Sequence, residues 1–276
     1  MGRGIAAPLW LAVVVALATA ARGDGAQPAG NVAPDPWSRD RAMIENLARE
    51  ISQDGIMAVA PHAAELEAAL AGAKQSIALA DSRNIYLASG ATDTLAQMAL
   101  AMSKGKSATA VPDPYALIAM DLGVYYDEVK RPEDALRVLD LGLALASDLS
   151  DMRTPLTIER GAALMGLKRW DEVVANEDAG LKLAVIEIPA KATLYRGRGY
   201  ALTELNRLDE AEDAYKESLN LEPGNELATH ELAYIHGLKL GAPRAPGGLK
   251  PLAPPAEGRQ PQETPAPSTD RPDRTL

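Results

Sequence analysis

Residues 193–224 read TLYRGRGYALTELNRLDEAEDAYKESLNLEPG, and this stretch decides the fold. Its apolar residues recur at helical spacing in two blocks. This spacing predicts a first helix over residues 193–205 and a second helix over residues 209–221, joined by a tight turn at 206–208. The stretch is therefore a predicted helix-turn-helix unit.

The ends of the second helix carry start and stop signals. Asp209 is the predicted N-cap, and the acidic residues Glu210 and Glu212 lie beside the positive end of the helix dipole. Pro223-Gly224 cannot easily continue a helix, so we expect the second helix to stop before it.

The same unit recurs upstream with a constant offset of 38 residues. Four glycines share this spacing: Gly123, Gly161, Gly199 and Gly237. Other positions repeat at the same offset: Arg131, Arg169 and Arg207; Asp134, Glu172 and Glu210; Ala135, Val173 and Ala211; Leu143, Leu181 and Leu219. Because the glycine of the first helix and the small residue of the second lack bulk, we expect the two backbones to approach closely.

The repeated pattern resembles the tetratricopeptide repeat family over residues 114–240. The third unit matches the family pattern through Tyr195, Gly199, Leu202, Ala211, Tyr215 and Pro223, and the first unit through Leu122, Gly123, Tyr126, Ala135 and Leu139. The second unit keeps Gly161 and Leu164, but it carries Val173 and Glu177 where the family prefers alanine and an aromatic residue. Residues 226–240 repeat a first helix alone, which typically caps such a stack.

The resemblance implies an all-α fold, with helix-turn-helix repeats stacked as a short right-handed superhelix. The usual period is about 34 residues, so each unit here has a few extra residues, expected in loops such as 147–155. Upstream, residues 37–113 form a predicted N-terminal helical region, and one more degenerate repeat is an interpretation of this region that stays open. Its expected elements are a helix over 37–52, a helix over 61–74, a helix pair over 76–102 broken near Ser89-Gly90, and a loop over 104–113.

Both ends of the chain are expected to lie outside the fold. Residues 1–20 resemble a signal peptide, with Arg3, an apolar run and the small-residue cleavage site Ala18-Thr19-Ala20. An uncleaved anchor is the alternative. Residues 21–36 form a predicted flexible segment, and the Pro-rich residues 241–276 a predicted disordered tail, because they cannot bury enough apolar surface. Cleavage predicts a secreted protein, periplasmic in a Gram-negative cell, with no membrane span left.

Composition narrows the function classes. The formal net charge is -10, and the basic residues are scattered, which argues against nucleic acid as a partner. Cysteine is absent, so disulfides and thiolate chemistry are excluded. The three histidines form no metal-binding motif, and Gly105-Lys106-Ser107 lacks the leading glycine of a phosphate loop. The sequence therefore predicts no enzyme, no catalytic residue, no cofactor and no metal.

The resemblance implies a concave groove, lined by the first helix of each unit, that binds a peptide or protein. The groove residues are those one turn apart on the expected exposed faces: Met120, Val124, Asp127, Ile158, Ala162, Met165, Arg196, Tyr200 and Thr203. Arg196, with Arg160 and Arg198, would give one end a basic character. Packing against a neighbouring helix is the alternative for the apolar members.

We therefore expect an exported scaffold or assembly factor that binds a protein or peptide partner through this groove. Two alternatives stay open at this point. One is an enzyme whose site lies within residues 37–113, and the other is a structural protein that associates with itself. The sequence does not specify the oligomeric state.

Overall fold

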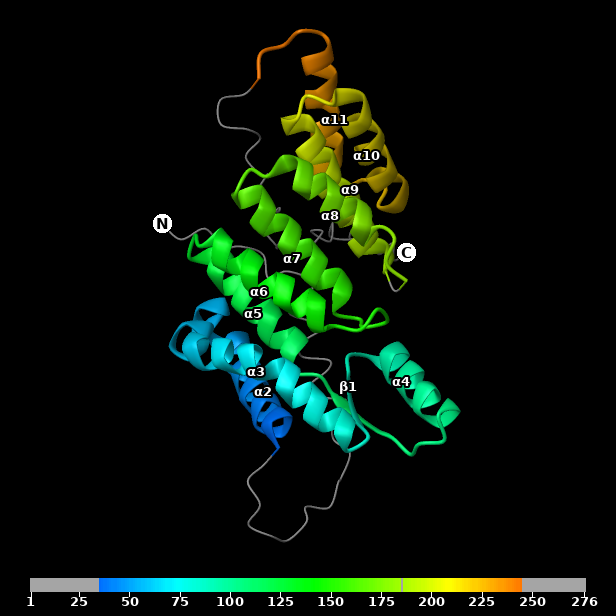
Figure 1. The fold of residues 1–276 in the computed structure, drawn as a ribbon. Helices are drawn as coiled ribbons and strands as arrows, with labels where there is room; N and C mark the ends of the chain where they lie inside the picture. Colours follow the sequence, from blue (N-terminus) through cyan, green and yellow to red (C-terminus); the bar gives the residue numbers. More distant parts are fainter. Residues whose placement is uncertain (1–34, 185, 245–276) are drawn as a thin grey trace, which may run out of the picture.

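The computed structural model describes residues 35–184 and 186–244, and this part of the chain is a stack of packed helices (Figure 1). Helices α2 and α3 lie at one end and α11 at the other, so the molecule is elongated. The predicted all-α class with stacked helix pairs is confirmed. The helices are α2 (Pro36–Asp54), the 3-10 helix η1 (Ile56–His62), α3 (Ala63–Ser82), α4 (Ala91–Ser103), α5 (Tyr115–Glu128), α6 (Pro132–Leu145), α7 (Arg153–Gly166), α8 (Trp170–Gly180), α9 (Ile188–Glu204), α10 (Leu208–Leu221) and α11 (Glu226–Lys239).

Three helix pairs follow one another along the stack: α5 with α6, α7 with α8, and α9 with α10. The first helices also pack on one another, α5 on α7 and α7 on α9, and α11 packs on α10 at the end. The extra residues of each repeat lie in the connections between pairs, at 146–152 and 181–187. The predicted signal peptide at 1–20 and most of the predicted tail, residues 245–276, lie outside the described residues.

The turn inside each pair repeats in detail. Lys130, Lys168 and Asn206 all adopt positive φ angles, of 63°, 57° and 61°. Such a left-handed residue is typical of the end of a helix, where it lets the chain reverse direction. The second helix of each pair starts two residues later, at Pro132, Trp170 and Leu208.

The predicted N-cap at Asp209 is wrong. Helix α10 begins at Leu208, its N-cap residue is Arg207, and no side chain caps it. Instead, the Arg207 guanidinium donates two hydrogen bonds of 2.7 Å to the Glu210 carboxylate. The sequence-based placement failed because the positive-φ residue moves the start of the helix one residue earlier.

The recurrent glycines are contact points between the helices of one pair. A Cβ atom on Gly123 would lie 2.6 Å from Leu139, and one on Gly199 would lie 2.7 Å from the ring of Tyr215. A Cβ atom on Gly161 would overlap the carboxylate of Glu177. Each glycine therefore makes room for one large side chain on the second helix, sixteen positions along in every unit.

The N-terminal region departs from the prediction. Between α3 and α5 the chain forms β1 (Ile85–Ala88), α4 and β2 (Thr109–Pro112), and the two strands pair in parallel with Ile85 opposite Thr109. Parallel strands need a crossover of a dozen or more residues, which α4 supplies. The predicted break near Ser89-Gly90 and the helix that follows it are confirmed by α4. Residues 85–88 and 109–112 are strands where the sequence predicted a helix and a loop, because runs of only four strand residues give little periodic signal.

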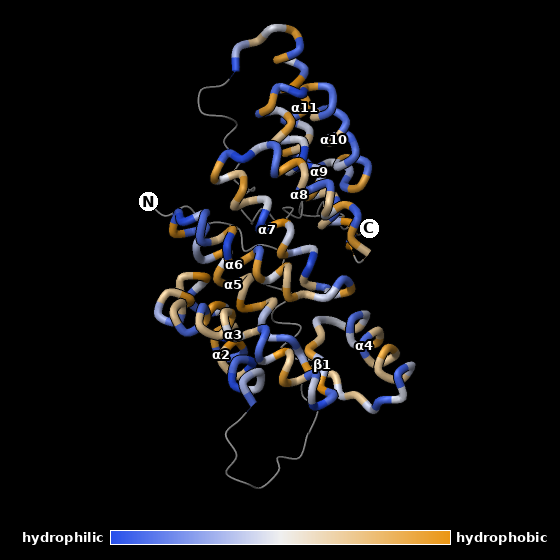
Figure 2. The backbone as a smooth tube through the Cα atoms, in the orientation of Figure 1, coloured by the Kyte–Doolittle hydropathy of each residue, from blue (hydrophilic) through white to orange (hydrophobic). Residues whose placement is uncertain are grey.

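Helix α4 projects from the side of the stack and packs on β1 and β2 (Figure 1). Hydrophobic stretches are visible along it in Figure 2, and Leu95 and Met102 are 70% and 74% exposed. None of the helices within residues 35–184 and 186–244 has the length and apolar character that crossing a membrane requires.

Candidate functional site

A cavity of about 490 Å³ lies where α7, α9 and α11 meet, and we call it the α9 pocket. Helix α7 contributes Ile158, Ala162 and Met165 to its lining, and α9 contributes Arg196 and Tyr200. All five are residues that the sequence placed on the groove. The capping helix α11 adds Leu227 and Glu231, while the second helices add Glu177 and Tyr215.

Two of the sequence-predicted groove residues belong to the core. Met120 and Thr203 are each 1% exposed, and the Thr203 hydroxyl donates a hydrogen bond to the Gly199 carbonyl oxygen. Their expected exposure is wrong, because each first helix is covered by its neighbours on more than one side. Val124 and Asp127 are half-buried on α5 and do not line the α9 pocket.

An aromatic pair holds one wall of the α9 pocket. The rings of Trp170, at the start of α8, and Tyr200 meet edge to face with their centroids 5.7 Å apart. Edge-to-face contacts of this kind fix ring orientation. Tyr200 thereby presents part of its ring to the cavity, beside the apolar side chains of Ile158 and Met165.

The expected basic character of this region is absent from the pocket, because each arginine is already paired. Arg196 donates to Glu222 at 2.5 Å and to Ser218 at 3.1 Å. Arg160 donates to Asp140 at 2.6 Å, and Arg198 donates to Asp178 at 2.7 Å. A guanidinium held by a carboxylate offers little net charge to a ligand.

Glu177 is a buried carboxyl group at the base of the α9 pocket. It is 2% exposed, and its Oε2 atom has no hydrogen-bond partner among the described residues. It occupies space left by two glycines, Gly161 on α7 and Gly197 on α9. Burial raises the pKa of Glu177 to about 8, with Asn176 partly opposing the shift and Asp178 adding to it.

Glu231 brings a second such group from α11. It is 4% exposed, and its Oε2 atom also lacks a hydrogen-bond partner within the described part of the chain. Burial, with a smaller contribution from the charge of Glu204, raises its pKa to about 7. An orphaned buried carboxyl oxygen is costly, so two of them around one cavity mark it as a site.

Sequence reasoning missed both glutamates. For Glu177 a signal was present, because it stands at the repeat position that holds Leu139 in the first unit and Tyr215 in the third. A carboxyl group at a position for large apolar side chains is a local conflict, and such conflicts are typical of functional sites. Glu231 carries no comparable signal, because its repeat equivalents are not core residues.

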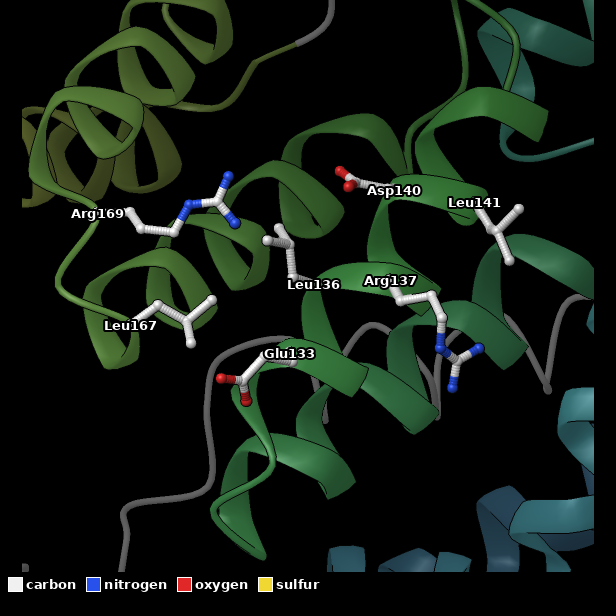
Figure 3. A pocket seen from close by; sticks show the side chains of 7 residues that line it. All are labelled: Glu133, Leu136, Arg137, Asp140, Leu141, Leu167 and Arg169. Carbon is white, nitrogen blue, oxygen red and sulfur yellow. The ribbon is translucent and has the colours of Figure 1, made fainter.

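A second hollow, the α6 pocket, has a volume of about 520 Å³ and lies on α6 near the turn after α7. Figure 3 shows Leu136 and Leu167 lying between the charged side chains of Glu133, Asp140 and Arg169. Asp140 is bound by Arg160, and Arg169 by Glu172. Because Asp140 and Arg169 are already paired, the α6 pocket offers a charged ligand less than the α9 pocket does.

An acidic cluster joins the segment of β1, α4 and β2 to the helix stack. Asp93 accepts hydrogen bonds from the Ser89 backbone N–H at 2.9 Å and the Ser147 hydroxyl at 2.6 Å. Asp113 accepts one of 2.8 Å from the Tyr115 backbone N–H, and burial raises its pKa to about 6. These bonds tie loops together. Within residues 35–184 and 186–244, no group of three or more acidic or histidine side chains is arranged to hold a metal ion.

Comparison with known proteins agrees with this architecture. Residues 192–225 match the tetratricopeptide repeat family model. The matched stretch covers nearly all of α9 and the whole of α10. The helix pair that the sequence singled out thus matches the family model, which supports the family resemblance for this part of the chain.

Individual proteins resemble longer stretches. RNA polymerase II-associated protein 3 of the mouse is 31% identical over 121 residues, which are 44% of this chain but 17% of the mouse protein. The first tetratricopeptide domain of human RPAP3 aligns at 25% identity and a TM-score of 0.41, covering 46% of this chain and 93% of that domain. Its second domain, solved with the HSP70 peptide SGPTIEEVD, aligns at 24% identity and a TM-score of 0.40, covering 44% of this chain and 95% of that domain.

Proposed function

We propose that this chain is a protein-interaction scaffold that binds an extended segment of a partner protein across α7, α9 and α11. The observation that carries the proposal is the α9 pocket, which gathers apolar, aromatic and unpaired polar groups from five helices. Pockets with a mostly apolar lining and a few convergent polar groups are the usual form of ligand sites.

Two features suit the pocket to a protein segment. Tyr200 combines apolar area with a hydroxyl group, and tyrosine is frequent at interaction hot spots. Ile158, Met165 and Leu227 supply an apolar floor on which side chains of an extended segment can pack. The family resemblance, which implies that the first helices line the binding surface, supports the choice of the same helices.

Site-specific photo-crosslinking tests the proposal. A photo-crosslinking amino acid replaces Met165 in the α9 pocket or, as the control, Met57, which is 51% exposed on η1 far along the stack. We expect one partner protein to be crosslinked from position 165 in cells and not from position 57. Equal yields from both positions would show that the pocket is not the binding surface.

We also propose that the protein is exported. Residues 1–20 have the pattern of a signal peptide, and a cleaved leader would place the binding surface outside the cytoplasm. Cell fractionation with mass spectrometry of the mature N-terminus tests this, and a full-length chain recovered in the cytoplasmic fraction would contradict it.

A further inference from the structure

We infer that the α9 pocket recognises a lysine or arginine side chain of the bound segment, with the carboxyl groups of Glu177 and Glu231 as its ligands. The inference rests on the proposed function and names the chemistry of the partner. It predicts a cationic anchor residue, flanked by apolar residues.

The first argument concerns unused hydrogen-bonding capacity. Glu177 and Glu231 each leave one buried oxygen without a donor among the described residues, and both line the same cavity. An ammonium or guanidinium group supplies donors only, three or five of them, and so matches a carboxylate oxygen that lacks a donor. Hydrogen bonds between ionised partners are also stronger than neutral ones.

The second argument concerns the competing charges. The cation inside the pocket, Arg196, is engaged by Glu222, Ser218 and Thr193. Arg160 and Arg198 face Asp140 and Asp178. Within residues 35–184 and 186–244, cations thus pair with the neighbouring carboxylates but with neither of these two glutamates. The net charge of -10 also favours approach of a basic partner.

The third argument concerns shape. Lysine and arginine have apolar stems that lie along apolar surface while the charged head reaches polar groups. Ile158, Met165 and Tyr200 line the same pocket as the glutamates and offer apolar surface for such a stem. A free polyamine has the same charged head but no neighbouring side chains to use the remaining floor, so a peptide is the better occupant.

Binding of a cation should release protons. In the free protein the raised pKa values keep Glu177 largely protonated and Glu231 about half protonated near pH 7. The groups around them are Arg196 and Tyr215 on the facing helices, with Asp178 on α8 and Glu204 on α9. A cation binds the carboxylate form, so affinity should increase as pH rises from 6 to 9.

The test uses the full chain and capped nine-residue peptide libraries, whose central residue is lysine, arginine, norleucine or glutamate. Binding is measured by fluorescence polarisation at pH 6, 7.5 and 9. We expect the lysine and arginine libraries to bind at least tenfold more tightly than the norleucine library at pH 9. We also expect their advantage to shrink at pH 6, whereas binding of the norleucine library stays constant.

Variants separate the pocket from general acidity. Glu177→Gln and Glu231→Gln should each reduce the preference for lysine over norleucine at least threefold. Asp121→Asn is the matched control: Asp121 is also a buried carboxyl with an unpartnered oxygen, but it lies on α5 outside the pocket lining, so it should leave the preference unchanged. Thermal unfolding of each variant is the control that checks whether the fold is retained.

The outcomes distinguish the two proposals. Equal binding of the lysine and norleucine libraries would overturn the cation site while the peptide-binding function stands. Absence of binding by every library would overturn both. If spermidine competed as strongly as the lysine library, a peptide would not be the occupant of the pocket. If a synthetic peptide of residues 245–276 bound more tightly than any library, the occupant would be this segment of the chain itself and not a segment of a partner protein.

Discussion

The third helix pair packs the ring of Tyr215 against Gly199, whereas the second pair packs the carboxyl group of Glu177 against Gly161. The backbone positions are equivalent, and both side chains are buried at 2% exposure. In the third pair the contact is apolar and contributes to stability, since burying a large side chain is favourable. In the second pair the same geometry carries a group whose burial is unfavourable unless it is paired.

The same position of the repeat can therefore serve either core packing or ligand binding. Tyr215 closes the interior of its pair, and Glu177 places an acceptor at the base of a cavity. A stack of similar pairs can accommodate such a group because the neighbouring pairs supply the rest of the core.

Truncation of the Tyr215 side chain should have the largest effect on stability. Tyr215→Ala is expected to lower the free energy of unfolding by about 3 to 5 kcal/mol, as for other large aromatic truncations in cores. Urea denaturation followed by circular dichroism measures it. If the free energy of unfolding fell by less than about 1 kcal/mol, the third pair would not depend on the packing of Tyr215.

Replacement of the buried carboxyl should act in the opposite direction. Glu177→Leu restores the side chain that the first pair carries at Leu139, and it should raise the free energy of unfolding by roughly 1 to 4 kcal/mol at pH 9. The same variant should lose the preference for lysine-containing peptides. If Glu177→Leu were destabilising, the contrast between the two pairs would be wrong.

The pH dependence sharpens the same contrast. The pKa of Glu177 is raised from 4.5 to about 8 on folding, so the folded state binds the proton more tightly than the unfolded state does. The stabilisation is present below pH 4.5 and is lost as pH rises through about 8. Wild type should therefore lose stability between these values, and Glu177→Leu should lose less. Some slope remains, because the pKa values of Asp121 and Glu231 are also raised, to about 7.

The glycine contact itself is tested by adding one methyl group. Gly199→Ala forces a Cβ atom into the Tyr215 ring and should lower the free energy of unfolding by about 1 to 3 kcal/mol. Gly72 on α3 is the control, because a Cβ atom there meets nothing within 4 Å. Gly72→Ala should be stabilising by roughly 0.5 to 1 kcal/mol, since alanine favours the helix. If both substitutions changed the free energy of unfolding in the same direction, the close contact between Gly199 and Tyr215 would be contradicted.

The exposed ion pairs at the turns should contribute least to stability. Arg169 pairs with Glu172 and Arg207 with Glu210 in the two helix pairs, and all four side chains are largely exposed. Such pairs are screened by solvent, so Arg169→Ala and Arg207→Ala should both leave the urea midpoint within experimental error. A clear shift in only one variant would reveal a further difference between the pairs.

Much of the fold could be predicted from the sequence, since the 38-residue recurrence of Gly123, Gly161 and Gly199 fixed the helix pairs. The candidate site was predicted less well. Ile158, Ala162, Met165, Arg196 and Tyr200 do line one cavity, but Met120 and Thr203 are buried and the expected basic character is neutralised. Periodicity identifies one face of a helix, but it does not identify the neighbours that cover the others.

The sequence by itself determined the helix-turn-helix repeat, because apolar spacing and close glycine contacts are local properties of each unit. Only the tertiary structure decided which charges are paired. Arg196 and Glu222 meet across helices, and the pair of Arg160 with Asp140 recurs as Arg198 with Asp178 at the repeat offset. The repeat pattern does not show that Glu177 and Glu231 each keep a buried oxygen without a donor among the described residues, because that depends on distances of a few ångströms between helices.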